Sequence, residues 1–76
     1  MKSFNTYNAK KHIGRIIKEQ RIKKHLTQQE LADLLSVGRQ YIWKIENGRI
    51  NLTLDYLDKI ISKLKCDSSD FFKNIQ

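Results

Sequence analysis

TQQELADLLSVGRQYIWKIENG, residues 27–48, predicts two short helices separated by only three residues. The first helix begins with a capping box: the Thr27 hydroxyl can accept a hydrogen bond from the Glu30 N–H, and the Glu30 carboxylate can accept one from the Thr27 N–H. The second helix is expected to end at Asn47-Gly48, a stop signal, because glycine readily adopts the left-handed conformation that closes a helix. Apolar residues recur at helical spacing in both segments and are expected to face the core: Leu31, Ala32, Leu35, Ile42 and Ile45.

The second helix of this pair keeps a free outer face. Positions 39, 40, 43 and 44 project from one side, because 43 and 44 lie one turn beyond 39 and 40. Arginine can bond bidentately to guanine, and glutamine can do so to adenine. The side chains on this face are typical of a helix that reads bases in the major groove of DNA: Arg39, Gln40, Trp43, Lys44 and Asn47.

The excess positive charge of the chain lies in the half that contains this helix pair. The protein has 76 residues and a net charge of +7; residues 1–49 carry 11 Lys or Arg and 4 Asp or Glu, whereas residues 50–76 carry 4 of each. This asymmetry indicates an anionic partner for the first half and a protein contact for the second. A basic surface that contacts only solvent is the alternative. The coincidence with the helix pair favours DNA.

Neither an enzyme nor a metalloprotein is expected. His12 and His25 have no Cys, Asp or Glu at ligand spacing, and neither a glycine-rich phosphate loop nor a Ser/His/Asp arrangement is present, so no metal, cofactor or catalytic site is expected. The single cysteine, Cys66, is expected to be a small buried hydrophobe. The absence of a signal pattern and of a long apolar run predicts a soluble, cytoplasmic protein without a membrane partner.

The rest of the chain predicts one all-α domain. A flexible arm of residues 1–8 precedes a domain of residues 9–76, whose last helix is expected to support dimerisation. Thr53 and Asp67 are candidate N-caps for two helices that follow the helix pair. Five helices and no strand are expected, over residues 9–24, 28–35, 39–47, 54–65 and 68–74.

Most of the chain, roughly residues 13–72, resembles the Cro/C1-type helix-turn-helix domains of phage repressors and small bacterial regulators. The motifs that carry the resemblance also have the right spacing: Arg21, LTQQELA at 26–32, RQYI at 39–42 and IENGR at 45–49. The resemblance implies a five-helix repressor-like bundle. It also implies that Arg39, Gln40, Trp43 and Lys44 occupy the base-facing positions of the recognition helix.

Further residues are expected to hold the duplex without reading bases. By resemblance, Gln28 contacts a phosphate and braces the recognition helix, while Asn47 and Arg49 belong to a loop that grips phosphates. Tyr41 and the N–H groups at helix starts, including that of Gly38, are expected to add positioning contacts.

One expected ion pair is structural. By resemblance, Arg21 and Glu46 link the first and third helices.

The sequence departs from the family pattern at several positions. At two of them, His25 and Ser36, the family commonly has glycine, and the residues here are expected to adopt the left-handed conformation less comfortably. The departures are His25 and Ser36 in place of glycine, Gly38 in place of a Ser or Thr cap, Gln20 in place of a core leucine, and Trp43 in place of a small polar residue.

Together these features predict a sequence-specific transcription regulator that binds a short inverted repeat in double-stranded DNA as a homodimer. Doubling the reading helix, with half-sites roughly 34 Å apart, multiplies the specificity of a small domain. Phe72 and Ile75 are expected at the dimer interface. The resemblance favours a repressor, a phage regulator or a restriction-modification controller, with RNA polymerase as a further candidate partner. The alternatives are an antitoxin that neutralises a toxin enzyme and autoregulates its operon, and a nonspecific nucleoid protein.

Overall fold

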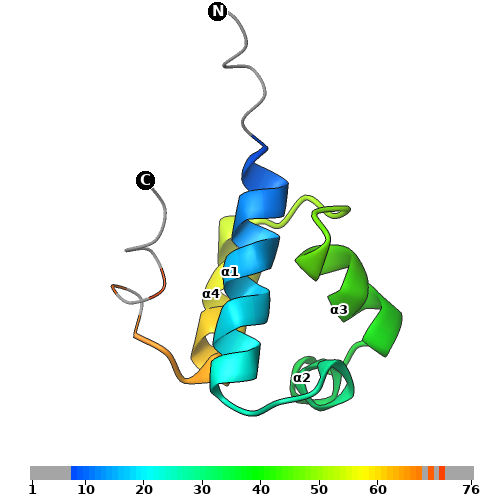
Figure 1. The fold of residues 1–76 in the computed structure, drawn as a ribbon, viewed down its shortest axis with the longest axis vertical. Coiled ribbons are helices and arrows are strands. Elements are labelled where there is room, and N and C mark those ends of the chain that lie inside the picture. Colours follow the sequence, from blue (N-terminus) through cyan, green and yellow to red (C-terminus); the bar gives the residue numbers. More distant parts are fainter. Residues whose placement is uncertain (1–7, 68, 70, 72–76) are drawn as a thin grey trace, which may run out of the picture.

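Four helices form the part of the chain that the computed structural model describes, which comprises residues 8–67, 69 and 71. They are α1 (Ala9–Lys23), α2 (Gln28–Leu35), α3 (Arg39–Glu46) and α4 (Leu54–Leu64). α3 packs against both α1 and α2, and α2 also packs against α4 (Figure 1). These residues contain no strand, in agreement with the predicted all-α class.

The helix starts agree with the sequence prediction, and three helices end one residue earlier than predicted. α2 has the predicted bounds. Lys24, Asn47 and Lys65 were expected as the last residues of α1, α3 and α4, and each is instead the C-cap that follows its helix. A difference of one residue lies within the range over which a helix end is defined.

The predicted fifth helix, residues 68–74, is not confirmed. The structure describes only Ser69 and Phe71 of this range, and the other residues lie outside the described part. Both described residues have helical backbone, and the Phe71 N–H donates to the Asp67 carbonyl at 2.9 Å. The described residues therefore contain four helices, and beyond Asp67 they include only Ser69 and Phe71.

Polar side chains define three of the four helix starts. The predicted capping box is present: the Glu30 N–H donates to the Thr27 hydroxyl at 3.0 Å, and the Thr27 N–H donates to the Glu30 carboxylate at 2.8 Å. The Thr53 hydroxyl likewise accepts from the N–H three residues later, at 3.0 Å. Asn8, which was expected in the flexible arm, caps α1 in the same way at 3.2 Å. The rest of that arm, residues 1–7, lies outside the described residues.

Each of the four helices ends in a Schellman motif. The residue in the left-handed conformation is Gly48 after α3, but His25, Ser36 and Lys65 after α1, α2 and α4, with φ of 61°, 59° and 56°. The following N–H donates to the carbonyl five residues earlier, at distances from 2.8 to 3.3 Å. The left-handed conformation expected at His25 and Ser36 is therefore confirmed. Only the turn after α3 uses glycine, the residue that adopts the left-handed conformation without strain.

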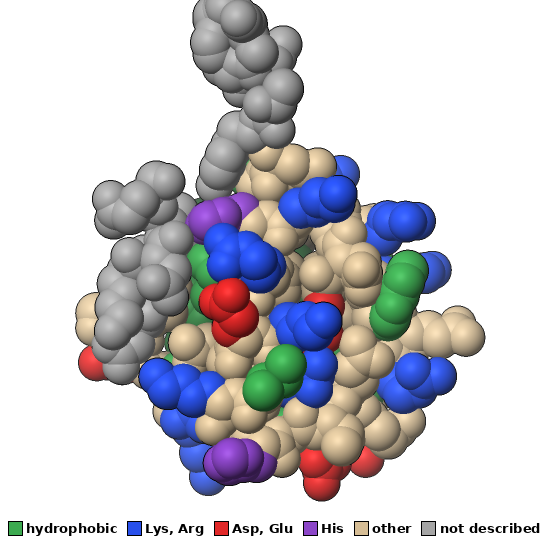
Figure 2. All heavy atoms as spheres, viewed as in Figure 1, with side chains coloured by type: hydrophobic (Ala, Val, Ile, Leu, Met, Phe, Trp, Pro, Cys, Tyr) green, Lys and Arg blue, Asp and Glu red, His purple; other side chains and the backbone are tan. Residues whose placement is uncertain are grey.

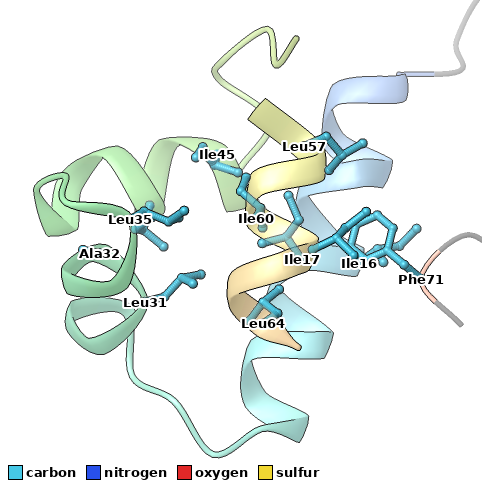
Figure 3. Packing of buried hydrophobic residues seen from close by; sticks show 12 residues of the cluster. Ile16, Ile17, Leu31, Ala32, Leu35, Ile45, Leu57, Ile60, Leu64 and Phe71 are labelled. Carbon is cyan, nitrogen blue, oxygen red and sulfur yellow. The ribbon is translucent and has the colours of Figure 1, made fainter. Parts of the chain in front are cut away.

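The hydrophobic core lies where the four helices meet (Figure 3). Phe71 contributes the largest fully buried side chain, beside Ile16 of α1. Gln20, at a position where a core leucine was noted as common, is also buried, with 7% of its surface exposed. Cys66 is half-buried against the core, in line with its expected packing role. The core residues are Ile16, Ile17, Leu31, Ala32, Leu35, Ile42, Ile45, Leu57, Ile60, Ile61, Leu64 and Phe71.

α1 and the end of α3 approach each other more closely than any side chain would allow. A Cβ atom on Gly14 would overlap the Ile45 carbonyl oxygen and lie 2.8 Å from that of Glu46. A Cβ atom on Gly48 would lie 2.6 Å from Cγ of Lys11. Two glycines, one on each partner, therefore allow α1 to pack directly on the backbone at the end of α3.

Candidate nucleic-acid interface

The outer side of α3 brings together the four residues that the sequence predicts as base readers. Arg39, Gln40, Trp43 and Lys44 are all exposed, and they alone line a shallow depression of about 400 Å³. Trp43 keeps 43% of its surface exposed, which is unusual for the one tryptophan of a small protein. In Figure 2 the edge of the molecule formed by α3 and the loop after it carries several Lys and Arg side chains.

The start of α3 is open toward solvent. Its N-cap, Gly38, is exposed, provides no side-chain hydrogen bond, and has nothing within 4 Å of the position that a Cβ atom would occupy. The Tyr41 N–H already donates to the Gly38 carbonyl at 3.0 Å. The N–H groups before it, which a Ser or Thr cap would partly occupy, therefore have no side-chain acceptor and can donate hydrogen bonds to an anionic ligand.

The inner side of α3 is held by a buried polar network. Glu46 accepts from Arg21 at both carboxylate oxygens, from Nε at 2.6 Å and from Nη2 at 3.1 Å, and it also accepts from Gln28 Nε2 at 3.1 Å. The Arg21 Nη1 donates to the Leu26 carbonyl at 2.7 Å. Only 1% of the Glu46 side chain and 10% of the Arg21 side chain are exposed. The ion pair and Gln28 thus fasten α1, α2 and α3 together.

Tyr41 of α3 packs against Tyr56 of α4. Its ring is half-buried and meets Tyr56 of α4 edge-on, with ring centroids 6.1 Å apart and an interplanar angle of 78°. The Tyr56 hydroxyl is buried and has no hydrogen-bond partner among the residues that the structure describes. Burial, and secondarily the nearby Tyr41, raises the pKa of Tyr56 above its usual 10.0. Tyr41 therefore links α3 to α4.

Asn47 and Arg49 both turn back toward Trp43. The Asn47 Nδ2 donates to the Trp43 carbonyl at 2.9 Å, and the Arg49 guanidinium lies over the Trp43 ring, 5.6 Å from its centroid. Sequence reasoning did not find this cation–π contact. The sequence signal for this contact was Gly48. A left-handed residue after a helix reverses the chain and so brings the next side chain back beside the helix.

The remaining predicted residues and features fall outside this surface. Phe72 and Ile75, the expected dimer contacts, lie outside the described residues. Within the described ranges, no group of three or more His, Cys, Asp or Glu could hold a metal ion, and no helix is long and apolar enough to cross a membrane.

A family model described as "Helix-turn-helix" matches residues 17–71. The chain is 39% identical over 57 residues to the "ImmF control region 10 kDa protein" of Bacillus phage phi105, which covers 75% of this chain and 63% of that protein. It therefore spans slightly less than two thirds of that relative. It is also 36% identical over 59 residues to the "Uncharacterized HTH-type transcriptional regulator YqaF" of Bacillus subtilis strain 168, which covers 78% of both chains.

Solved structures show the same fold. The restriction-modification controller protein C.AhdI from Aeromonas hydrophila matches with a TM-score of 0.76 and 29% identity, over 87% of this chain and all of that one. A point variant of the restriction-modification controller protein C.Esp1396I matches with a TM-score of 0.79 and 30% identity, over 88% and 89% of the two chains. The clp gene regulator ClgR from C. glutamicum, at 24% identity and a TM-score of 0.76, shares the fold over 82% and 80%.

Proposed function

The chain belongs to the Cro/C1-type helix-turn-helix family of transcription regulators, and we propose that it binds a short inverted repeat in double-stranded DNA as a homodimer. The observation that carries this proposal is the division of α3 into two sides. One side is fixed to α1 and α2 through Glu46, and the other exposes Arg39, Gln40, Trp43 and Lys44 as a group. A helix that reads bases needs a fixed side and an exposed side, since base contacts require side chains that project from a rigidly held backbone.

Base recognition falls to three polar side chains of this group. Arg39 suits guanine and Gln40 suits adenine, because each can form two hydrogen bonds with that base in the major groove. Lys44 can donate to guanine or to a phosphate. Each bidentate pair discriminates by about 1–3 kcal/mol, so one domain distinguishes only a few base pairs.

Phosphate contacts are expected on both sides of these base contacts. The Gln28 amide nitrogen has two N–H donors, of which Glu46 takes one and a phosphate can take the other. The open N–H groups after Gly38 suit a second phosphate. Arg49 and Asn47 follow the other end of α3, so that phosphates on both sides of the groove can be held. These contacts set affinity and register, not sequence preference.

Two copies are needed to reach the specificity of a regulator. A two-fold axis would place the second α3 in the next major groove, about 34 Å away. Phe72 and Ile75 remain the proposed interface. A Phe72→Asp variant is expected to shift the protein to a monomer in analytical ultracentrifugation, whereas Ile22→Asp, at an exposed apolar position of α1, is expected to leave the dimer intact. A dimer that survives Phe72→Asp would contradict this interface.

The function is tested by selecting preferred duplexes from a random library at about 150 mM salt, because lower salt inflates nonspecific binding. Arg39→Ala and Gln40→Ala are expected to lose preference at one base pair each, by about 1–3 kcal/mol, while binding to a scrambled duplex stays unchanged. Lys63→Ala removes a charge from an exposed position on α4 and serves as the control. Unchanged base preference in both α3 variants would overturn the proposal.

A further inference from the structure

We infer that Trp43 is a positioning residue for Arg49: its ring holds the Arg49 guanidinium at the edge of the reading face, directed at a DNA phosphate, and does not itself read a base. The inference deepens the proposed function and rests on it. It changes the role that the sequence predicts for Trp43, which was expected among the base readers.

The backbone on both sides of the contact is fixed. Gly48, with φ of 71°, turns the chain back, and the Arg49 N–H donates to the Lys44 carbonyl at 2.8 Å. The Asn47 side chain donates to the Trp43 carbonyl at 2.9 Å. The backbone of Arg49 is therefore held in one position beside α3, and its side chain lies over the Trp43 ring.

The cation–π contact leaves the arginine able to bind. The Arg49 guanidinium donates no hydrogen bond to the described residues, and its N–H groups match the oxygens of a phosphate. Within the described part of the chain Arg49 has no ion-pair partner, since the two salt bridges there join Arg15 to Glu19 and Arg21 to Glu46. The stack is thus the interaction that orders this side chain before a ligand arrives.

Holding the Arg49 side chain in place before DNA binds should strengthen its contact with a phosphate. A free arginine loses much rotamer freedom when it binds a phosphate, and that cost falls if the side chain is already held. At an exposed site, a cation–π contact of this kind corresponds to about a two- to fivefold change in an equilibrium constant. Loss of the Trp43 ring should weaken phosphate binding by about this factor without altering base preference.

The first test concerns the free protein. Trp43 is the one tryptophan of the chain, so its fluorescence reports directly on its surroundings. Arg49→Ala is expected to change the emission intensity in the absence of DNA, whereas Lys44→Ala, an equal loss of charge on the same face, is expected to change it less. Equal or absent responses would overturn the inference, whatever the protein binds.

The second test uses the full chain with its selected duplex and a scrambled duplex. Trp43→Leu is expected to weaken both about two- to fivefold, and Trp43→Phe, which keeps an aromatic face, less. Arg49→Ala should lower the salt slope of binding by about 0.9, as for one lost phosphate contact. In the Trp43→Leu background, Arg49→Ala should cost clearly less than in the native background. Circular dichroism confirms that each variant is folded.

The outcomes separate this inference from the function on which it rests. If the native protein prefers no duplex, the proposed function fails and the inference fails with it. If the native protein is selective but the Trp43 and Arg49 effects simply multiply, only the inference is overturned. A loss of preference at one base pair in Trp43→Leu would show instead that the indole reads a base directly, and would also overturn it.

Discussion

Removing the Glu46 carboxylate should destabilise the protein more than any surface substitution. Glu46→Ala deletes three hydrogen bonds at once, two from Arg21 and one from Gln28. It leaves the Arg21 guanidinium, with a side chain only 10% exposed, without a counter-charge and bonded only to the Leu26 carbonyl. Breaking one partner of a buried ion pair costs about 3–5 kcal/mol, chiefly because the other charge stays buried.

This loss is large on the scale of the whole domain. A chain of this length is expected to have an unfolding free energy of about 4–11 kcal/mol. Glu46→Ala should therefore lower Tm by at least about 12 °C. Urea unfolding followed by far-ultraviolet circular dichroism, with Trp43 fluorescence as a second probe, measures the change.

Three control variants isolate the cause. Glu46→Gln keeps the shape and should lose less than Glu46→Ala. Arg21→Met combined with Glu46→Leu removes both charges and should fold with a stability close to native, since apolar replacement of a buried pair is often neutral. Glu19→Ala breaks the exposed pair with Arg15, whose side chains are about half exposed, and should cost at most about 1 kcal/mol. A loss in Glu46→Ala no greater than that in Glu19→Ala would refute the reasoning.

Four further substitutions test other features of the fold. Gly14→Ala should destabilise by about 1–3 kcal/mol although alanine favours helices, because its Cβ would overlap the Ile45 carbonyl; an unchanged or higher Tm would show that α1 can shift freely. His25→Gly and Ser36→Gly should each raise stability by about 0.5–1 kcal/mol by relieving a left-handed residue, and additive gains in thermal melts are expected, whereas no gain would argue against strain there. Tyr56→Phe should not destabilise, because it removes a hydroxyl without a partner. Since the folded pKa of Tyr56 is raised above 10.0, its contribution to stability is present below pH 10 and is lost as pH rises through the raised pKa, so the native protein should lose stability relative to Tyr56→Phe above pH 10 in urea unfolding.

Local signals in the sequence were sufficient to predict most of the fold. The capping box at Thr27, the cap at Thr53 and the glycine at 48 each involve residues within a few positions of one another, so the sequence alone specifies them. The same holds for the exposed side of α3, because helical periodicity separates it from the buried side.

Features that depend on contacts between distant segments were not predictable in this way. In the sequence, Gly14 indicates only a residue that lowers the stability of a helix. The packing of α1 on α3 shows why a side chain is excluded there. By contrast, the contact of Arg49 with Trp43 joins residues only six positions apart, and the turn at Gly48 was its signal in the sequence. The buried Tyr56 hydroxyl has no sequence signal at all, since a tyrosine at a half-buried helix position usually keeps its hydroxyl in water.

The close seating of α1 on the end of α3 has an evolutionary consequence. Because Gly14 and the Arg21–Glu46 pair hold α3 in one orientation, its tilt cannot be adjusted to suit a different binding sequence. Mutations that retarget the protein are therefore confined to outward side chains, which contribute little to folding. Under the proposed function, the target sequence can thus change through these side chains while the contacts that hold α3 stay the same.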